Sequence, residues 1–375
     1  MIDQGTIALL LKGVNALTWE SMVMLGVSFV LFYLAIVKDY EPILLLPIAA
    51  GCMLANLPLS PLIAEDGMLK ILYNMGVGNE MFPLLIFIGI GALTDFGPLL
   101  ENPRLVLLGA AGQFGIFLTL LLALLLGFTQ PEAASIGIIG AIDGPTSIYV
   151  SGILAPHLVG PITVAAYSYM SLVPIILPPV IKLLTTKEER LIRMPYSQRK
   201  ISKRTRILFP IVVTVLVGTL VPFATPLIGM LMLGNLMKES GVVERLTKAS
   251  ANEIANAVTL FLGLAIGSTM VGADFLKPST LFIMVLGLLA FALDGCAGVL
   301  FAKILNWLSG GKVNPMIGAA GISAFPMAAR VVQRVAQEDD FENFLLMHAM
   351  GANAAGQVAS VVAGGVLLAL MGAGG

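Results

Sequence analysis

Residues 137 to 147 read Gly-Ile-Ile-Gly-Ala-Ile-Asp-Gly-Pro-Thr-Ser and lie inside a long apolar part of the chain. A carboxylate such as Asp143 costs roughly 2.5–3.5 kcal/mol at membrane depth, and residues of this kind usually face a cavity or an ion path. Gly144 and Pro145 follow it and interrupt the helix where lipid offers no replacement hydrogen bonds. Many transporters build an ion site at the membrane midplane from a charged group beside a broken helix. The stretch therefore predicts a broken membrane helix that carries a functional carboxylate.

The composition indicates that the whole chain is an integral membrane protein. Of its 375 residues, 58% are hydrophobic and 11% are charged, whereas soluble domains carry about 25% charged residues. At about 20 apolar residues per span, the length allows roughly ten to eleven transmembrane or re-entrant helices. We therefore predict an all-α polytopic fold. The two cysteines, Cys52 and Cys296, lie in apolar segments and predict buried thiols rather than a disulfide framework or a zinc site.

Charge and hydropathy divide the chain into five parts. Residues 1–17 have the pattern of an interfacial amphipathic helix, and residues 18–80 hold the N-terminal spans. Residues 81–181 form a first repeat with a broken helix, and residues 207–375 form a second repeat and the C-terminal spans. Between them, residues 182–206 carry nine of the 21 basic residues, so the positive-inside rule places this loop in the cytoplasm. The loop is either a topology determinant that touches anionic head groups or a docking surface for an acidic soluble partner.

The two halves of the chain resemble each other in the order and spacing of their motifs. An Asp-Phe pair at 95–96 begins 45 positions before the glycine of Ile-Gly-Ala at 139–141. A second Asp-Phe pair, at 274–275, begins 44 positions before the glycine of Ile-Gly-Ala at 317–319. This order predicts inverted structural repeats whose broken helices meet at a midplane site. The second broken element would span residues 314–330.

Oxygen-bearing side chains accompany Asp143. The hydroxyls of Thr146 and Ser147, with unwound backbone carbonyls, are ligands that suit Na⁺ beside a carboxylate. In the alternative interpretation the motif is only a helix kink, with Asp143 capping the following segment through its side chain. Asn353 is a further polar group within an apolar helix, and it either binds an ion or only forms a hydrogen bond to a neighbouring helix.

The predicted second broken element contains no acid. It offers Asn314, Gly318 and Ser323, and it ends at Arg330 in an otherwise apolar run. A guanidinium there needs an anion, which could be Asp143, a substrate carboxylate or a lipid phosphate. Alternatively, Arg330 and the arginine one turn later extend to the interface at a helix end.

Three strings of the sequence resemble a known family. They are Gly-Ala-Ile-Asp-Gly-Pro-Thr-Ser at 140–147, Asn-Pro-Met-Ile-Gly-Ala-Ala-Gly-Ile-Ser-Ala-Phe-Pro-Met-Ala-Ala-Arg at 314–330 and His-Ala-Met-Gly-Ala-Asn-Ala at 348–354. Together they resemble the β subunit of the sodium-pumping biotin-dependent decarboxylases, whose complexes act on oxaloacetate, methylmalonyl-CoA or glutaconyl-CoA. The resemblance covers nearly the whole chain.

The resemblance implies an activity and a set of partners. A soluble carboxyltransferase subunit moves the substrate's carboxyl group onto biotin, which is held by a carrier domain and is not attached to this chain. The membrane subunit decarboxylates this carboxybiotin and couples the release of CO2 to Na⁺ export, with consumption of a proton. The resemblance further implies a small single-span membrane subunit, a homotrimer of this chain that moves by an elevator-like shift, and a multi-pass position in the bacterial inner (plasma) membrane.

The resemblance also assigns roles to residues. Asp143 matches the key acidic residue of the Na⁺ pathway, and we expect it to act in catalysis with Tyr169 and Arg330. The residues expected to bind carboxybiotin are Arg330, Asn314 and Gly318. The residues expected to bind Na⁺ are Asp143, Asn314, Ser323, Asn353, Thr146 and Ser147. In this hypothesis Arg330 orients the carboxylate or ureido oxygen, and Na⁺ binding at Asp143 displaces a proton that reaches biotin through Tyr169.

The competing interpretation is a secondary transporter, either a Na⁺-coupled carboxylate carrier or a Na⁺/H⁺ antiporter. It would use the same repeats, broken helices and membrane carboxylate. The sequence has no Gly-x4-Gly-Lys-Ser/Thr phosphate loop, so it does not hydrolyse ATP by that route. Uphill ion movement must therefore draw its energy from another ion or from a bound reactive group.

Overall fold

A computed structural model describes residues 12–39, 42–195 and 201–372 of the chain. Every regular element within these ranges is helical, which confirms the predicted all-α fold class. Five helices are long and apolar enough to cross a membrane, or seven if each of two bent helix pairs counts as one span. The larger number of roughly ten to eleven spans and re-entrant helices stays a prediction. The interfacial helix predicted for residues 1–17 lies mostly outside the described residues.

Long helices alternate with short helical turns in both halves of the chain. The first half contains α2 (Trp19–Ile36), α3 (Pro42–Asn56), η1 (Pro61–Ile63), α4 (Met68–Leu72), η2 (Tyr73–Val77), α5 (Met81–Leu93), α6 (Gly97–Glu101), η3 (Pro103–Leu105), α7 (Val106–Ala111), α8 (Phe114–Leu125), α9 (Gln130–Gly137), η4 (Ile138–Ala141), α10 (Gly144–Leu154), η5 (Pro156–Leu158), α11 (Val159–Leu184) and α12 (Lys187–Arg190). The second half contains α13 (Lys203–Leu220), η6 (Pro222–Ala224), α14 (Thr225–Ser240), α15 (Glu244–Ala249), η7 (Ser250–Ile254), α16 (Ala255–Ser268), α17 (Gly272–Phe275), α18 (Pro278–Leu308), η8 (Pro315–Ala320), α19 (Met327–Asp339) and α20 (Leu346–Leu370).

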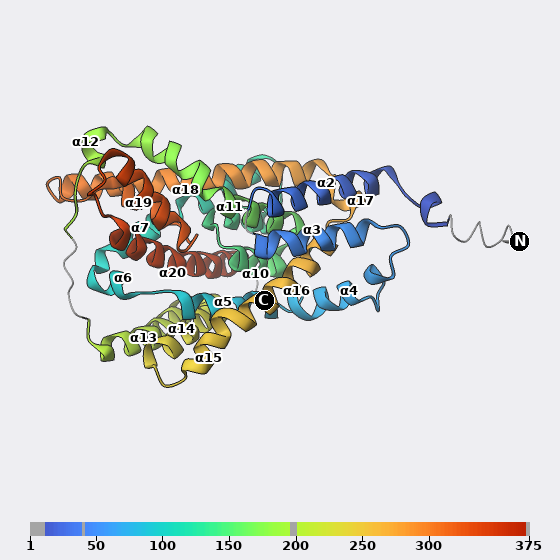
Figure 1. The fold of residues 1–375 in the computed structure, drawn as a ribbon, viewed down its shortest axis with the longest axis horizontal. Helices are drawn as coiled ribbons and strands as arrows, with labels where there is room; N and C mark the ends of the chain where they lie inside the picture. The colour runs from blue at the N-terminus through green and yellow to red at the C-terminus, as the bar shows by residue number, and fades with distance from the viewer. Residues whose placement is uncertain (1–11, 40–41, 196–200, 373–375) are drawn as a thin grey trace, which may run out of the picture.

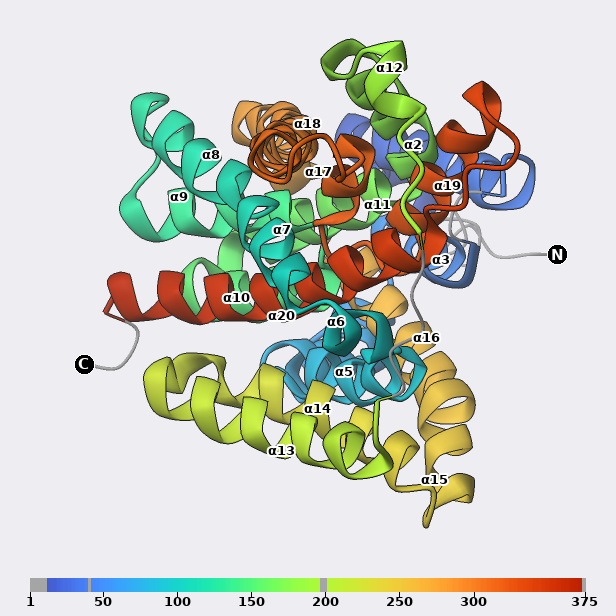
Figure 2. The same cartoon turned by 90° about the vertical axis from the view of Figure 1, so that its left-hand side faces the viewer.

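A central group of helices is flanked by two peripheral groups (Figures 1 and 2). In the centre, α18 packs against α8, α11 and η8, and α20 packs against α7, α10 and α19. In one peripheral group α3 packs between α2 and α16, and in the other α14 packs between α13 and α5. Figure 2 shows α13, α14 and α5 together on one side of α20, with α2 and α3 farther away. The central helices therefore have a helical layer on more than one face.

Glycines bring the peripheral helices into close contact. A Cβ atom on Gly51 of α3 would lie 2.4 Å from the carbonyl oxygen of Leu264 in α16. A Cβ atom on Gly91 of α5 would lie 1.8 Å from the carbonyl oxygen of Leu231 in α14. Both crossings therefore require a residue without a side chain, as in other closely packed membrane helices.

A buried asparagine reinforces each of these crossings. The Asn56 side-chain amide at the end of α3 donates to the carbonyl oxygen of Met270, 2.7 Å away, just beyond α16. The Asn235 amide in α14 donates to the carbonyl oxygen of Thr94, 3.1 Å away, just beyond α5. Carbonyl groups at a helix end lack partners in their own helix and must be satisfied inside the protein when lipid surrounds it. Asn56 and Asn235 each satisfy such a carbonyl group, one in each peripheral group.

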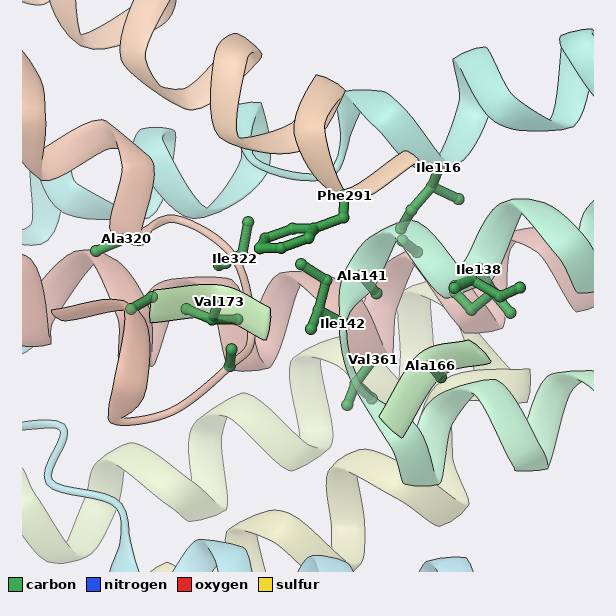
Figure 3. Close-up of a cluster of buried hydrophobic side chains, with 14 of the residues drawn as sticks. Ile116, Ile138, Ala141, Ile142, Ala166, Val173, Phe291, Ala320, Ile322 and Val361 are labelled. Carbon is green, nitrogen blue, oxygen red and sulfur yellow. The ribbon is translucent and has the colours of Figure 1, made fainter. Parts of the chain in front are cut away.

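Two interrupted helical segments lie in the centre of the structure, at the two places where the sequence predicts broken elements. The first comprises α9, η4 and α10, and the second comprises η8 and the loop that leads to α19. Figure 3 shows Ala141 and Ile142 of the first segment near Ile322 of the second, with Phe291 of α18 beside them. All four side chains are at most 1% exposed. The breaks therefore lie in a dry apolar cluster, where each backbone group needs a protein partner.

The contact between α5 and α14 generates a stability prediction. A Cβ atom on Gly234 would lie 2.0 Å from the carbonyl oxygen of Ile88, so Gly234→Ala forces the two helices apart. We expect this change to destabilise the protein by about 1–3 kcal/mol, the usual cost of overpacking. Gly229→Ala on the same helix is the matched control, because no atom lies within 4 Å of a Cβ atom there. Thermal unfolding in detergent measures both variants, and equal midpoints would contradict the packing argument.

Candidate functional site

Asp143 lies at the break between η4 and α10. Ile142 adopts a left-handed backbone conformation with φ of 53°, which is rare for a β-branched residue and costs on the order of 1–3 kcal/mol. Asp143 is the N-cap residue of α10, and its Oδ1 atom accepts a hydrogen bond from the N–H of Thr146 at 3.2 Å. Pro145 occupies the first turn, where its missing N–H is tolerated. The capping role that the sequence offers as an alternative is therefore present.

Capping uses only one of the two carboxylate oxygens. The Oδ2 atom of Asp143 accepts hydrogen bonds from Gln357 Nε2 at 3.1 Å and from Ser360 Oγ at 2.8 Å, both on α20. Asp143 is 3% exposed, so these donors replace water. Neither Gln357 nor Ser360 is among the site residues predicted from the sequence. The sequence does contain a pattern that could have identified them. Gln357 and Ser360 lie four and seven positions after Asn353, and positions i, i+4 and i+7 share one face of a helix.

The second interrupted segment meets the first beside Asp143. The backbone N–H and the side-chain hydroxyl of Ser323 both donate to the carbonyl oxygen of Ala141, at 3.3 and 3.0 Å. The amide of Asn353 donates to the carbonyl oxygen of Ile322 at 2.6 Å. The structure thus brings together Ser323, Asn353 and the Asp143 break, while their binding of Na⁺ stays a prediction.

Several oxygens at this meeting point remain available. Thr146 Oγ1 and Asn353 Oδ1 are buried and have no hydrogen-bond partner in the described structure. The Ser147 hydroxyl, by contrast, donates to the Asp143 carbonyl oxygen at 2.9 Å. Buried side-chain oxygens without a hydrogen-bond partner suit a cation that prefers oxygen ligands. Among the described residues no group of three His, Cys, Asp or Glu side chains is arranged to hold a metal ion.

The two tyrosines of α11 have different surroundings. The Tyr169 hydroxyl donates to the carbonyl oxygen of Met284 in α18, so no direct hydrogen bond joins it to Asp143. The ring of Tyr167 instead packs against the Asp143 segment, because a Cβ atom on Gly144 would lie 2.1 Å from its Cζ atom. The tyrosine in contact with the break is therefore Tyr167, whereas the tyrosine predicted from the sequence is Tyr169.

Arg330 lies on the exposed face of α19. No hydrogen bond or ion pair joins it to Asp143 in the described part of the chain. It lines a cavity of about 590 Å³ together with Asp95, Phe325, Pro326 and residues of α5 and α20. Phe325 and Pro326 follow Ser323 closely, so this cavity extends to the second interrupted segment. Among the described residues Arg330 forms no ion pair, so its guanidinium can meet an anion that enters this cavity.

Asn314 and Gly318 hold the second interrupted segment in place. The Asn314 amide donates to the carbonyl oxygens of Arg190 and Ile192, at 3.0 and 2.8 Å, while its Oδ1 atom caps η8. Gly318 touches α18, since a Cβ atom there would lie 2.0 Å from the carbonyl oxygen of Gly298. Neither residue has a contact with Asp143, and their predicted binding of carboxybiotin or Na⁺ stays a prediction.

Asn314 thereby attaches a segment that we call the strap, residues 185–195. Ion pairs with the α19–α20 region also hold the strap and the end of α11. Lys182 Nζ lies 2.7 Å from Glu338, Arg190 Nε lies 2.5 Å from Asp339, and Arg193 contacts Asp340 at 2.6 Å and Glu342 at 3.0 Å. Part of the basic charge in the 182–206 loop is therefore neutralised within the chain and is not available to an acidic partner.

A buried carboxylate at the junction of two interrupted helical segments is typical of ion-coupled membrane proteins. Residues 20–371 match the family described as the Na⁺-transporting oxaloacetate decarboxylase beta subunit. The chain is 53% identical over 361 residues to glutaconyl-CoA decarboxylase subunit beta of Acidaminococcus fermentans, with 96% of each chain covered. It is 52% identical over 360 residues to methylmalonyl-CoA decarboxylase subunit beta of Veillonella parvula, covering 96% of this chain and 95% of the relative. It is 49% identical over 407 aligned positions to oxaloacetate decarboxylase beta chain 2 of Salmonella typhimurium, covering 92% and 94%.

The chain therefore belongs to the family of Na⁺-transporting oxaloacetate decarboxylase β subunits, which confirms the resemblance seen in its motifs. It is a multi-pass membrane subunit of a multi-subunit decarboxylase, in which decarboxylation of carboxybiotin is coupled to Na⁺ transport. This membership decides against a pure secondary transporter, because the driving reaction belongs to the family.

The strap generates a pH-dependent prediction. Two hydrogen bonds from Arg193 lower the pKa of the Asp340 carboxyl below its usual range. Because the pKa is lower in the folded state, the pair stabilises fully above the pKa of the unfolded chain. That stabilisation is lost as the pH falls through the folded-state pKa. We expect Arg193→Gln to lower the thermal midpoint slightly at neutral pH and not at all in acid.

The matched control for this prediction is Lys187→Gln. Lys187 lies on the strap, is exposed and forms none of the ion pairs described above. Between pH 7 and pH 3, the difference in thermal midpoint from the wild-type protein should shrink to zero for Arg193→Gln and should be absent throughout for Lys187→Gln. A difference for Arg193→Gln that grows in acid has the opposite sign and would contradict the assignment.

Proposed function

We propose that Na⁺ transport and carboxybiotin decarboxylation meet at Asp143. The observation that carries this proposal is the surroundings of Asp143, a buried carboxylate held by Gln357 and Ser360 at the junction of two helix breaks. The unpartnered oxygens of Thr146 and Asn353 supply further ligands for Na⁺. Ser323 positions the carbonyl oxygen of Ala141 and contributes to the proposed Na⁺ site in this way.

The same carboxylate binds either Na⁺ or a proton. In a dry site it does not stay ionised without a cation, so the arrival of Na⁺ releases the proton. Decarboxylation consumes that proton: the N–COO⁻ bond of carboxybiotin breaks, CO2 leaves, and the proton forms the N–H bond of biotin. Removal of water from the carboxylate of carboxybiotin favours the same bond cleavage. One acidic group thereby links the chemical step to the occupancy of the ion site.

Arg330 is the proposed anchor for the incoming carboxybiotin. It lines the cavity of about 590 Å³ that opens between α5 and the α19–α20 region. Its planar guanidinium can donate two hydrogen bonds to the carboxylate or one to the ureido oxygen. Asn314 and Gly318 act on this site from a distance, by holding the second interrupted segment against the strap and α18. Tyr169 supports the packing of α11 on α18, through its hydrogen bond to Met284.

We further propose that the chain contains two inverted repeats. Two features support this: α3 pairs with α16 as α14 pairs with α5, and Asn56 and Asn235 form equivalent hydrogen bonds. Residues 47–57 and 226–236 align without a gap and share Pro, Met, Leu, Asn and Leu at equivalent positions. This pairing extends the first repeat, expected at 81–181, to include α2 and α3. The carboxylate and the guanidinium then lie on interrupted segments from different repeats.

The proposed partners follow from the reaction. Carboxybiotin must arrive on a biotin carrier domain that a soluble carboxyltransferase subunit has loaded, so the cavity beside Arg330 faces the cytoplasm with the 182–206 loop. A small single-span membrane subunit and a homotrimer of this chain complete the proposed complex in the inner membrane. The relatives are named for three acyl substrates at 49–53% identity, which supports selection of the substrate by the carboxyltransferase.

Asp143→Asn tests the central proposal. The amide keeps the cap of α10 but binds neither a proton nor Na⁺ as a carboxylate does. We expect Na⁺-stimulated decarboxylation by the assembled complex to fall at least about 100-fold, the usual range for loss of an acid–base group. Asp66→Asn, at an exposed position, is the matched control. Full Na⁺-dependent and avidin-sensitive decarboxylation in the Asp143→Asn complex would overturn the coupling scheme.

Arg330→Lys separates anchoring from extension toward the interface. Lysine keeps the positive charge and a similar side-chain length, but it lacks the planar guanidinium that can donate two parallel hydrogen bonds. We expect kcat/KM for decarboxylation to fall at least about tenfold, because an oriented pair of hydrogen bonds is lost. Arg245→Lys, on the exposed surface of α15, is the matched control. An unchanged kcat/KM in the Arg330→Lys complex would favour simple extension of the side chain to the interface.

A further inference from the structure

A second buried carboxyl group lies in the membrane core, and the proposed reaction does not use it. Asp294, near the middle of α18, is 0% exposed. It does not line the cavity beside Arg330, and it forms no ion pair with another described residue. A carboxyl group at this depth is costly, so its surroundings must supply the compensation.

Asp294 caps a helix in a different part of the chain. α7 ends at Ala111 and α8 begins at Phe114, which leaves the first N–H groups of α8 without partners in their own helix. The N–H groups of Gly115 and Ile116 donate to the Asp294 carboxyl. Lipid offers no replacement for these acceptors, and the positive end of the helix dipole favours a carboxylate. Asp294 therefore fixes the start of α8 against α18.

The second oxygen of Asp294 faces the segment that carries Asp143. Oδ2 has no hydrogen-bond partner in the described structure, and a Cβ atom on Gly140 would lie 2.8 Å from it. Gly140 belongs to η4, three residues before Asp143 and next to Ala141, whose carbonyl oxygen accepts from Ser323. η4 therefore lies directly on the Asp294 carboxyl.

The second interrupted segment has a similar support. Gln113, at the junction of α7 and α8, donates from Nε2 to the carbonyl oxygen of Gly109 at 3.1 Å and to that of Gly321 at 3.4 Å. Gly321 lies two residues before Ser323. Each break is thus in contact with a buried polar side chain from a neighbouring helix. The hydrogen bonds to the Asp294 carboxyl come from backbone N–H groups, which suits support of the backbone.

We propose that Asp294 is a positioning residue that holds η4 in place and thereby sets the Na⁺ affinity of the Asp143 site, an inference that rests on the function proposed above. It acts through the backbone of residues 140–143 and touches neither Na⁺ nor carboxybiotin. Outer groups that orient the ligands of a metal ion typically change its affinity 10–100-fold when they are removed.

The first test compares Asp294→Leu with Asp294→Asn in the assembled complex. Leucine has a similar size but no acceptor, so we expect the half-saturating Na⁺ concentration to rise at least about tenfold. Turnover at saturating Na⁺ should fall less than the affinity does. Asparagine keeps one acceptor oxygen for the α8 N–H groups and should restore the Na⁺ constant to within about threefold of wild type. Equal losses in both variants, with lower turnover at saturating Na⁺, would assign a proton-transfer role and overturn the proposal.

The second test leaves Asp294 intact and applies even if Asp294→Leu fails to fold. Gly140→Ala inserts a methyl group between η4 and the carboxyl, and we expect it to raise the half-saturating Na⁺ concentration severalfold. Gly152→Ala on α10 is the matched control, because no atom lies within 4 Å of a Cβ atom there. An unchanged Na⁺ constant in Gly140→Ala, together with unchanged hydrogen exchange of residues 137–147, would overturn the proposal.

Hydrogen exchange of residues 137–147 separates this inference from the function on which it rests. Faster exchange together with weaker Na⁺ binding in Gly140→Ala supports both. Faster exchange with an unchanged Na⁺ constant means that η4 has loosened but that the ion site is not at Asp143, and the proposed function then fails. Unchanged exchange with weaker Na⁺ binding means that Asp294 does not act through η4, and the positioning role then fails.

Discussion

The hydrogen bonds from Ser323 to the carbonyl oxygen of Ala141 join the two interrupted segments, and the site depends on them. A continuous membrane helix satisfies its own backbone and offers nothing to an ion. Where two helices break, N–H and carbonyl groups are released, and they must find partners within the protein. In this chain the breaks meet each other in the apolar interior, so that the polar groups of one satisfy those of the other. Asp143 lies beside this junction and takes its remaining partners from α20.

The sequence predicts those residues of this site that interrupt an apolar, helical run. Asp143 followed by Gly and Pro is unusual in an apolar run, and so is the proline-flanked segment that contains Ser323. Gln357 and Ser360 are not predicted, because a single amide or hydroxyl in a membrane helix is common and forms local hydrogen bonds at little cost. Only the fold shows that this face of α20 points at the carboxylate.

Long-range pairing explains other differences between the sequence and the structure. The basic strap appears in the sequence as free positive charge, yet Arg190 and Arg193 pair with acids about 150 positions later. The Asn314 amide attaches the strap, a contact that the sequence does not predict, while its predicted binding of Na⁺ or carboxybiotin stays a prediction. Tyr167 contacts the break because of the rotation of α11, which periodicity alone does not fix, and the predicted catalytic role of Tyr169 stays a prediction. The type of a residue therefore indicates which chemistry its side chain can perform, whereas the fold determines which groups that side chain contacts.

Ile142 links the backbone conformation next to Asp143 to the packing of the apolar core. Its backbone is left-handed and its side chain is 1% exposed, packed in the cluster of Figure 3. Glycine would adopt this conformation freely, whereas isoleucine holds it only while burial of the side chain offsets the strain. The kink before Asp143 therefore forms together with the packed interior and not before it. In a newly inserted chain whose helices have not yet assembled, the backbone around Asp143 would therefore not yet have its final conformation.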